Sequence, residues 1–204
     1  MHHSVRRLAR LTALPLSLMA FASLQAAATV SRQSAETFSK KVAIIRQQAQ
    51  VEERVGGRRT PLTQDELNSW FAFQGTPHLP NGVTQPQVTI VGQGKVSGQA
   101  VVDLDAIAKR RASGGAFDPW SLVGGRVPVT VTGVLHTRDG KGRFEPESAQ
   151  IAGLPVPPAM LQELLTHYSR SPERPEGLRI DQTFSLPANI RQIEVGAGQA
   201  VVVQ

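Results

Sequence analysis

The sequence predicts an α+β fold in which helices pack against one face of a long, curved antiparallel sheet. Three observations lead to this class. Apolar and polar residues alternate through the middle of the chain, with turn residues between the runs. Apolar residues recur at helical spacing in three other stretches. Gly98 and Gly133 interrupt two long strands on their apolar side, where a bend or a close approach is expected.

Residues 1–28 have the layout of a secretory signal peptide. A basic stretch, residues 6–10, precedes an apolar run over 11–24 and three alanines at 26–28. The apolar run is shorter than the roughly 20 residues that a membrane-spanning helix needs. We therefore expect cleavage before Thr29 and a periplasmic or extracellular protein, the alternative being an uncleaved N-terminal anchor.

The remaining residues, 29–204, are expected to form a single domain. Three of the 22 lysines and arginines lie in the leader, so the mature chain has a net charge of only +3, spread along its length. The chain has no basic stripe with interleaved aromatic residues, so nucleic acid is not an expected partner. A net charge of this size is compatible with transient contact with an anionic membrane surface. The absence of cysteine excludes disulfides and thiol catalysis.

The first half of the mature chain predicts two helices. Apolar residues at i, i+4, i+7 and i+11 indicate a helix over Ser34–Val55, with Ser34 as its N-cap and Gly56-Gly57 after its end. A short basic linker is expected next. Thr63 and Glu66 have the spacing of a capping box, which places the start of a second helix at Thr63.

Two strands follow, over 87–92 and 95–104, around a Gly-Gln-Gly turn. Their even-numbered apolar residues should share one face: Val88, Ile90, Val96, Ala100, Val102 and Leu104. A brief helical turn is expected after them. In the glycine-rich loop 112–125, Phe117 and Trp120 either fold back onto the sheet or form a tip that touches a membrane.

A longer hairpin is predicted around Asp139-Gly140. Its first strand should turn Val127, Val129, Val131 and Leu135 toward the interior, and Thr130 and Thr132 toward solvent. Prolines at 155, 157 and 158 introduce a third helix, and a polar loop covers 169–177. A terminal hairpin over 184–204 completes the fold.

The sequence offers no catalytic constellation. The mature chain has three histidines, His78, His136 and His167, without metal-ligand spacing, and it lacks a nucleophile elbow and a phosphate loop. We therefore expect a protein that is not an enzyme and that has no metal or other cofactor. The interior glycines instead suggest a curled sheet with a groove along its concave side, or equally a sheet against which a helix packs closely.

The second half of the chain resembles the bacterial LmeA-like phospholipid-binding family of the tubular lipid-binding (TULIP) group. The matching elements lie within 126–204: the V-x-V-x-G run of Val129–Gly133, Asp139-Gly140, the segment Gly153–Pro157, and the segment from Leu186-Pro187 through Val195. The resemblance implies a curved sheet wrapped around a helix, with the terminal hairpin as its last wall and an apolar lumen for acyl chains.

On this basis the chain is expected to bind or carry a lipid or another apolar small molecule in the cell envelope. The alternative is a structural or interaction module whose core is filled by its own side chains. Inward-facing positions in the terminal hairpin would include Leu186, Val201 and Val203. The residues expected to contact lipid are Val96, Gly98, Ala100, Val129, Val131, Gly133, Leu135, Phe184, Ile193 and Val195.

Overall fold

The structure, a computed structural model, describes residues 30–50, 57–108, 125–169, 175–177 and 179–204. The leader, residues 51–56 and the loop with Phe117 and Trp120 lie outside the described residues. In chain order the elements are α1 (Arg32–Gln48), β1 (Arg59–Thr63), α2 (Gln64–Trp70), a π-helical turn (Phe71–Gly75), a 3₁₀ turn (Thr76–His78), β2 (Val83–Gly92), β3 (Lys95–Asp103), α3 (Leu104–Ala108), β4 (Arg126–Arg138), β5 (Lys141–Ile151), β6 (Leu154–Val156), α4 (Pro158–Ser169), β7 (Phe184–Ser185), β8 (Gln192–Val195) and β9 (Gln199–Val203).

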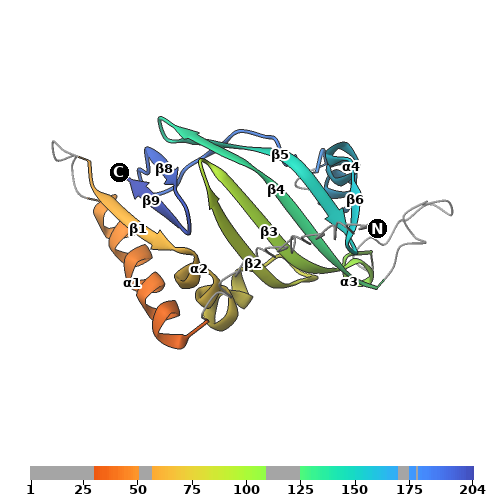
Figure 1. The fold of residues 1–204 in the computed structure, drawn as a ribbon, viewed down its shortest axis with the longest axis horizontal. Coiled ribbons are helices and arrows are strands. Elements are labelled where there is room, and N and C mark those ends of the chain that lie inside the picture. Colours follow the sequence, from red (N-terminus) through yellow and green to blue (C-terminus); the bar gives the residue numbers. More distant parts are fainter. Residues whose placement is uncertain (1–29, 51–56, 109–124, 170–174, 178) are drawn as a thin grey trace, which may run out of the picture.

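The predicted α+β class with a large antiparallel sheet is confirmed. The main sheet has the strand order β2-β3-β4-β5-β6, with β7 paired to one end of β5. A second sheet has the order β1-β9-β8. Figure 1 shows helices α1 and α2 at one end of the main sheet and α4 at the other. No helix among the described residues is long and apolar enough to cross a membrane.

The main sheet contains three register shifts, two of which lie away from the hairpin turns and favour curvature. In β2, the pairing with β3 shifts in register between Thr84 and Gln87, and Gln85 within this shift has a φ of 51°. In β5, Glu147 is the extra residue between two pairs, Thr132↔Ser148 and Gly133↔Pro146. Such bulges bend the bulged strand and increase the local twist. Strands of ten to thirteen residues can therefore curl without losing their pairing.

The terminal hairpin belongs to the small sheet and not to the main one, so it is not the last wall of a roll. Its buried residue Val202 joins Ile45 of α1 and Ile190 in a core cluster, against which Ile193 packs. The register pairs Ile193 with Val202 and Val195 with Ala200. Odd positions of β8 therefore share a face with even positions of β9. The prediction that Val201 and Val203 face inward together with Ile193 and Val195 is wrong.

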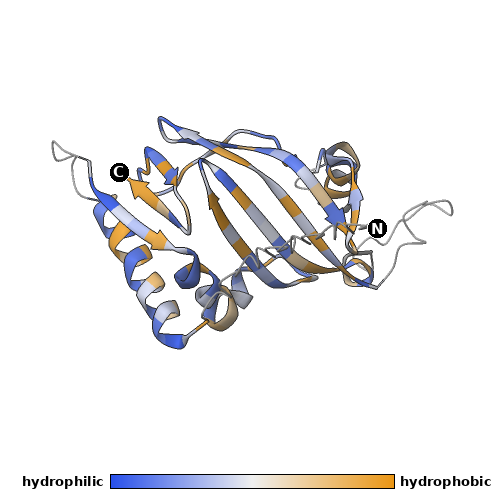
Figure 2. Ribbon diagram, in the orientation of Figure 1, coloured by the Kyte–Doolittle hydropathy of each residue, from blue (hydrophilic) through white to orange (hydrophobic). Residues whose placement is uncertain are grey.

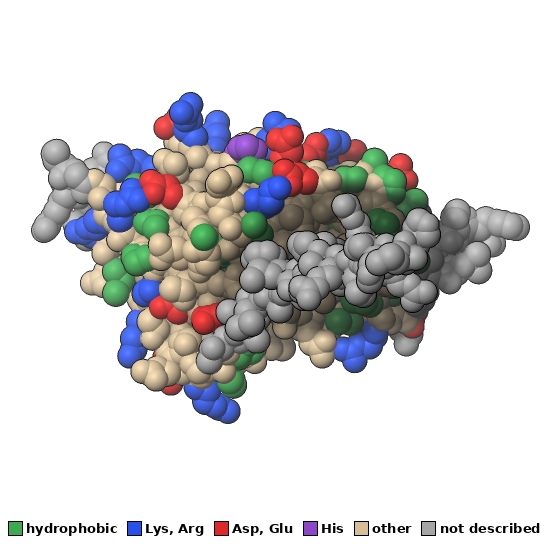
Figure 3. All heavy atoms as spheres, in the orientation of Figure 1, with side chains coloured by type: hydrophobic (Ala, Val, Ile, Leu, Met, Phe, Trp, Pro, Cys, Tyr) green, Lys and Arg blue, Asp and Glu red, His purple; other side chains and the backbone are tan. Residues whose placement is uncertain are grey.

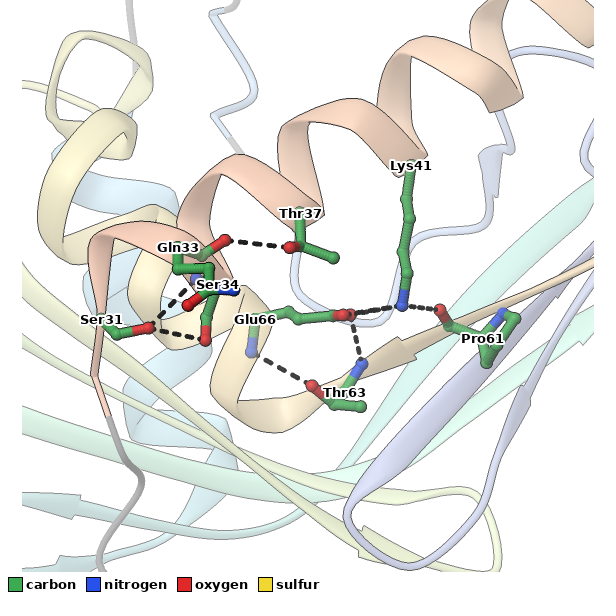
Figure 4. Close-up of polar contacts among 8 residues, drawn as sticks. All are labelled: Ser31, Gln33, Ser34, Thr37, Lys41, Pro61, Thr63 and Glu66. Carbon is green, nitrogen blue, oxygen red and sulfur yellow. Dashed lines mark hydrogen bonds and ion pairs between the residues drawn. The ribbon is translucent and has the colours of Figure 1, made fainter.

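Helix α1 begins and ends earlier than its sequence predicts. Its N-cap is Ser31 and not Ser34, because the Ser31 hydroxyl accepts a hydrogen bond from the Ser34 amide at 3.1 Å (Figure 4). At the other end, the carbonyl of Ala49 accepts from the Asn189 side chain and that of Ile45 from Gln204. These contacts satisfy helix-end carbonyls, so C-terminal residues distant in sequence contribute to ending α1 after Gln48.

The predicted capping box at the start of α2 is confirmed and extended. The Thr63 hydroxyl accepts from the Glu66 amide, and the Glu66 carboxylate accepts from the Thr63 amide. Lys41 of α1 adds an ion pair with Glu66 at 2.7 Å and donates to the Pro61 carbonyl (Figure 4). Residues 59–63 form strand β1 where the sequence predicted a basic linker, because this segment pairs with β9.

Helix α2 also covers the exposed edge of the main sheet. The Asn68 side chain donates to the Val88 carbonyl and accepts from the Val88 amide, both at 2.8 Å. The Gln64 side chain accepts from the Ile90 amide at 2.8 Å, and the Ile90 carbonyl accepts from the Gly198 amide. These four hydrogen bonds satisfy the backbone amides and carbonyls of Val88 and Ile90, which would otherwise be free to pair with a further strand. This part of the edge is therefore closed to pairing with another chain.

Candidate functional site

The candidate site is one face of the main sheet, where apolar residues of neighbouring strands stand directly opposite one another. The pairs between β3 and β4 are Val96↔Gly133, Gly98↔Val131, Ala100↔Val129 and Val102↔Val127. The face continues onto β2, where Ile90 pairs with Val96, and onto β5, where Ala149 pairs with Val131. We call these residues, together with Leu135, the apolar face. Seven of the ten predicted contact residues belong to it.

The side chains of the apolar face are buried toward its edges and half-buried at its centre. Ile90 is 5% exposed and Ala149 is 3% exposed, and α2 and α4 pack against the strands that carry them. Between them, Val96, Ala100, Val129 and Val131 are half-buried and Gly98 is exposed. Figure 2 shows hydrophobic residues recurring along the central strands, and Figure 3 shows the molecule hollowed between its two ends. Among the described elements, β3 contacts mainly its two neighbouring strands, β2 and β4.

The two predicted groove glycines differ in their surroundings. A Cβ atom built on Gly98 would meet no atom within 4 Å, so this position opens onto free space above the apolar face. A Cβ atom on Gly133 would collide with the Glu145 carbonyl and lie 2.7 Å from Cζ of Phe144. Gly133 is therefore required for the close approach of β5 at its bulge, and it offers no space for a ligand.

The other three predicted contact residues lie away from the apolar face. Phe184 is 45% exposed, and its ring lies over Gly142, where a Cβ atom would be 2.6 Å from the ring. This contact covers a strand glycine with an aromatic ring. Ile193 and Val195 are on β8 of the small sheet. They meet Leu135 in a groove at the end of the β4–β5 hairpin.

The opposite face of the main sheet carries the polar residues of the same strands. Thr132 donates a hydrogen bond to the Ser97 hydroxyl at 2.9 Å across the β3–β4 pair. Thr130 pairs with Gln99 on the same side. The register therefore places Val129 and Val131 on one face and Thr130 and Thr132 on the other. All four residues are half-buried, so the prediction that the two threonines face solvent stays a prediction.

One hydroxyl makes two of the hydrogen bonds that join the two sheets. Oγ1 of Thr137 donates to the Ile193 carbonyl at 2.8 Å and accepts from the Ile193 amide at 2.9 Å. The Gly94 amide donates to the Val195 carbonyl close by. The end of β4 and the end of the β2–β3 hairpin thus hold β8 in place, which fixes one end of the apolar face.

An exposed, bidentate ion pair near this end lies on the small sheet. Arg59 donates to both carboxylate oxygens of Glu194. These hydrogen bonds hold the pKa of Glu194 below the ordinary value of 4.5, and the guanidinium charge lowers it further. The pair fixes Glu194 to its own sheet and does not place a charge on the apolar face.

Chemically, the apolar face can exclude water from an apolar molecule and can do little else. Its members have no titratable side chain. Among the described residues, no group of three histidine, aspartate or glutamate side chains is placed to hold a metal ion. Comparisons with protein-family models, with curated proteins and with solved structures find no match for this chain.

Sequence reasoning missed the polar contacts that frame the site. Asn68 and Gln64 have the i, i+4 spacing of neighbours on a helix surface, but no sequence pattern shows that they face a strand edge. Thr137 occupies the next odd-numbered position after the apolar residues of β4. In the sequence, only its place near the end of the strand distinguishes it from the other threonines of β4. Basic residues flank the Asp139-Gly140 turn on both sides, and this cluster is the sequence signal for the charged groove at the hairpin end.

Proposed function

We propose that this protein is an exported, non-catalytic binder or carrier of a lipid or another apolar ligand in the cell envelope. The observation that carries the proposal is the apolar face, which is half-buried at its centre and opens onto free space at Gly98. The N-terminal signal pattern supports export, and the resemblance to the LmeA-like family supports an acyl-chain ligand.

The dimensions of the face agree with this role. From Val127 to Leu135 the apolar residues of β4 extend over about 26 Å, at roughly 3.3 Å per residue. Each buried methylene contributes about 0.8 kcal/mol, so a chain that buries five to ten of them gains roughly 4–8 kcal/mol. That range corresponds to millimolar to micromolar dissociation constants before ordering costs are subtracted.

Gly98→Leu tests the proposal because the new side chain would fill the free space that the ligand is proposed to occupy. Gln99→Leu is the matched control, since Gln99 is exposed on the opposite face of the same strand. Each purified protein would be extracted with organic solvent and the extract analysed by mass spectrometry.

We expect lipid in the wild-type and Gln99→Leu extracts, and at least a fivefold smaller amount from Gly98→Leu at an unchanged melting temperature. A wild-type protein without any bound apolar molecule, which also takes up none from a lipid mixture, would contradict the proposal. It would support the alternative of a structural or interaction module with a filled core.

A further inference from the structure

A groove of about 560 Å³ lies between the end of the β4–β5 hairpin and strand β8. Gly94, Leu135, Ile193 and Val195 contribute its apolar part. Its polar part has an unusual composition, because it contains three permanent cations and a single carboxylate. The polar lining residues are His136, Thr137, Arg138, Lys141, Arg143, Thr183, Gln192 and Glu194.

The basic residues of the groove form a block of two cross-strand pairs. Arg138 stands opposite Lys141, and His136 stands opposite Arg143, on the same face of the hairpin. Like charges directly opposite each other on a sheet are destabilising. The Arg138–Lys141 pair therefore costs stability unless an anion lies between the side chains, and the His136–Arg143 pair does so only when His136 is protonated.

None of the nearby carboxylates, which are Asp139, Glu145, Asp181 and Glu194, forms an ion pair with Arg138, Lys141 or Arg143 in the described part of the chain. Glu194 is held by Arg59, and Asp181 by Arg179 at 3.0 Å. Glu145 contacts only His136 of this block, at 3.4 Å. Within the described ranges, Arg138, Lys141 and Arg143 form no ion pair, although Arg143 is close enough to Asp181 to lower the pKa of that carboxyl slightly. Three cations thus line the hairpin side of the groove without a counter-charge of their own.

We propose that this groove binds a phosphate-type oxyanion between Arg138, Lys141 and Arg143. Two guanidinium groups can each donate a pair of parallel hydrogen bonds to phosphate oxygens, and the lysine adds a compact charge. The groove volume exceeds that of the anion and leaves room for the group to which the phosphate is esterified. The site shares only Leu135 with the apolar face and does not depend on a lipid being bound there.

The first test uses inorganic phosphate at low ionic strength, followed by ¹H–¹⁵N spectra of the full mature protein. We expect saturable shifts of the Gly140, Lys141 and Gly142 amides, and at least tenfold weaker binding in Arg138→Gln/Lys141→Gln. The control Lys40→Gln/Arg46→Gln removes two exposed cations from α1 instead, so it has the same net charge. It should bind phosphate within twofold of the wild type.

The double substitution should not impair folding, because it removes a repulsion. Its melting temperature without phosphate should equal or exceed that of the wild type, whereas added phosphate should stabilise the wild type more. Shifts that do not saturate, or equal weakening by the control pair, would overturn the proposal.

A second arm distinguishes a lipid headgroup from a soluble phosphate ester. Co-sedimentation with vesicles of phosphatidylglycerol is compared with vesicles of phosphatidylcholine. One outcome is that the wild type is retained on the anionic vesicles in a way that Arg138→Gln/Lys141→Gln abolishes and Lys40→Gln/Arg46→Gln preserves. That result supports the site, with a membrane lipid as the source of the phosphate group. Saturable phosphate binding without vesicle retention supports the same site with a soluble ester. Retention lost equally in both double variants, with no phosphate shifts, contradicts it.

Discussion

Asn68→Ala should open the covered edge of the main sheet. The substitution removes both hydrogen bonds to Val88 and leaves its amide and carbonyl without their partner. An unsatisfied buried group costs about 1–3 kcal/mol. Since Val88 is only half-buried and water can reach part of it, we take the lower end for each group, about 2 kcal/mol in total. In a protein of this size, that lowers the melting temperature by about 4–8 °C.

Hydrogen exchange gives the sharper assay. Exchange of the Val88 amide should accelerate in Asn68→Ala, whereas the Ile90 amide should stay protected by Gln64. Gln64→Ala should reverse this pattern. Gln87→Ala, at an exposed position of the same strand, is the control and should change neither amide. A melting temperature within 1 °C of wild type, together with unchanged exchange at Val88, would refute the account of the edge.

Three further predictions concern positions around the site. Gly133→Ala should destabilise by at least about 2 kcal/mol in chemical unfolding, because its Cβ would collide with β5, whereas Gly98→Ala should be neutral or slightly stabilising; equal effects would contradict the assignment. Thr137→Val should cost about 1–3 kcal/mol and loosen β8, while Thr137→Ser should restore most of the loss; a serine variant no better than valine would argue against the hydroxyl. The folded-state pKa of Glu194 is lowered, so the stabilising contact with Arg59 is present above pH 4.5 and lost as the pH falls through the folded value. The melting-temperature difference between wild type and Glu194→Gln should therefore close on acidification, and a difference independent of pH would count against this contact.

Local patterns in the sequence predicted much of the main sheet. The alternation in β4 and the Asp139-Gly140 turn specify a hairpin, and this hairpin is observed with its turn at those residues. The capping box at Thr63 likewise depends on residues three apart. Such features are decided within a few residues, which is why a single sequence contains enough information to find them.

The remaining errors concern contacts between distant segments. The loop of the terminal hairpin sets the pairing of Val195 with Ala200, and a register differing by one residue would have turned Val201 inward instead of Val202. Strand β1 exists because it pairs with β9 more than 130 residues away in sequence, as Arg59↔Val203 shows. In the sequence, Gly133 and Gly98 look equivalent. In the structure, the bulged strand β5 lies against Gly133, whereas the space at Gly98 is free.

The central claim, that the apolar face binds an apolar chain, is tested most directly by methyl NMR with a neutral dodecyl amphiphile below its micelle concentration. Val96, Val129 and Val131 lie on the apolar face, whereas Val101 and Val134 lie on the opposite one. We expect saturable shifts and intermolecular contacts from the dodecyl chain at the first three valines, and none at the other two. Binding without any contact to the first three, or equal shifts on both faces, would contradict the claim.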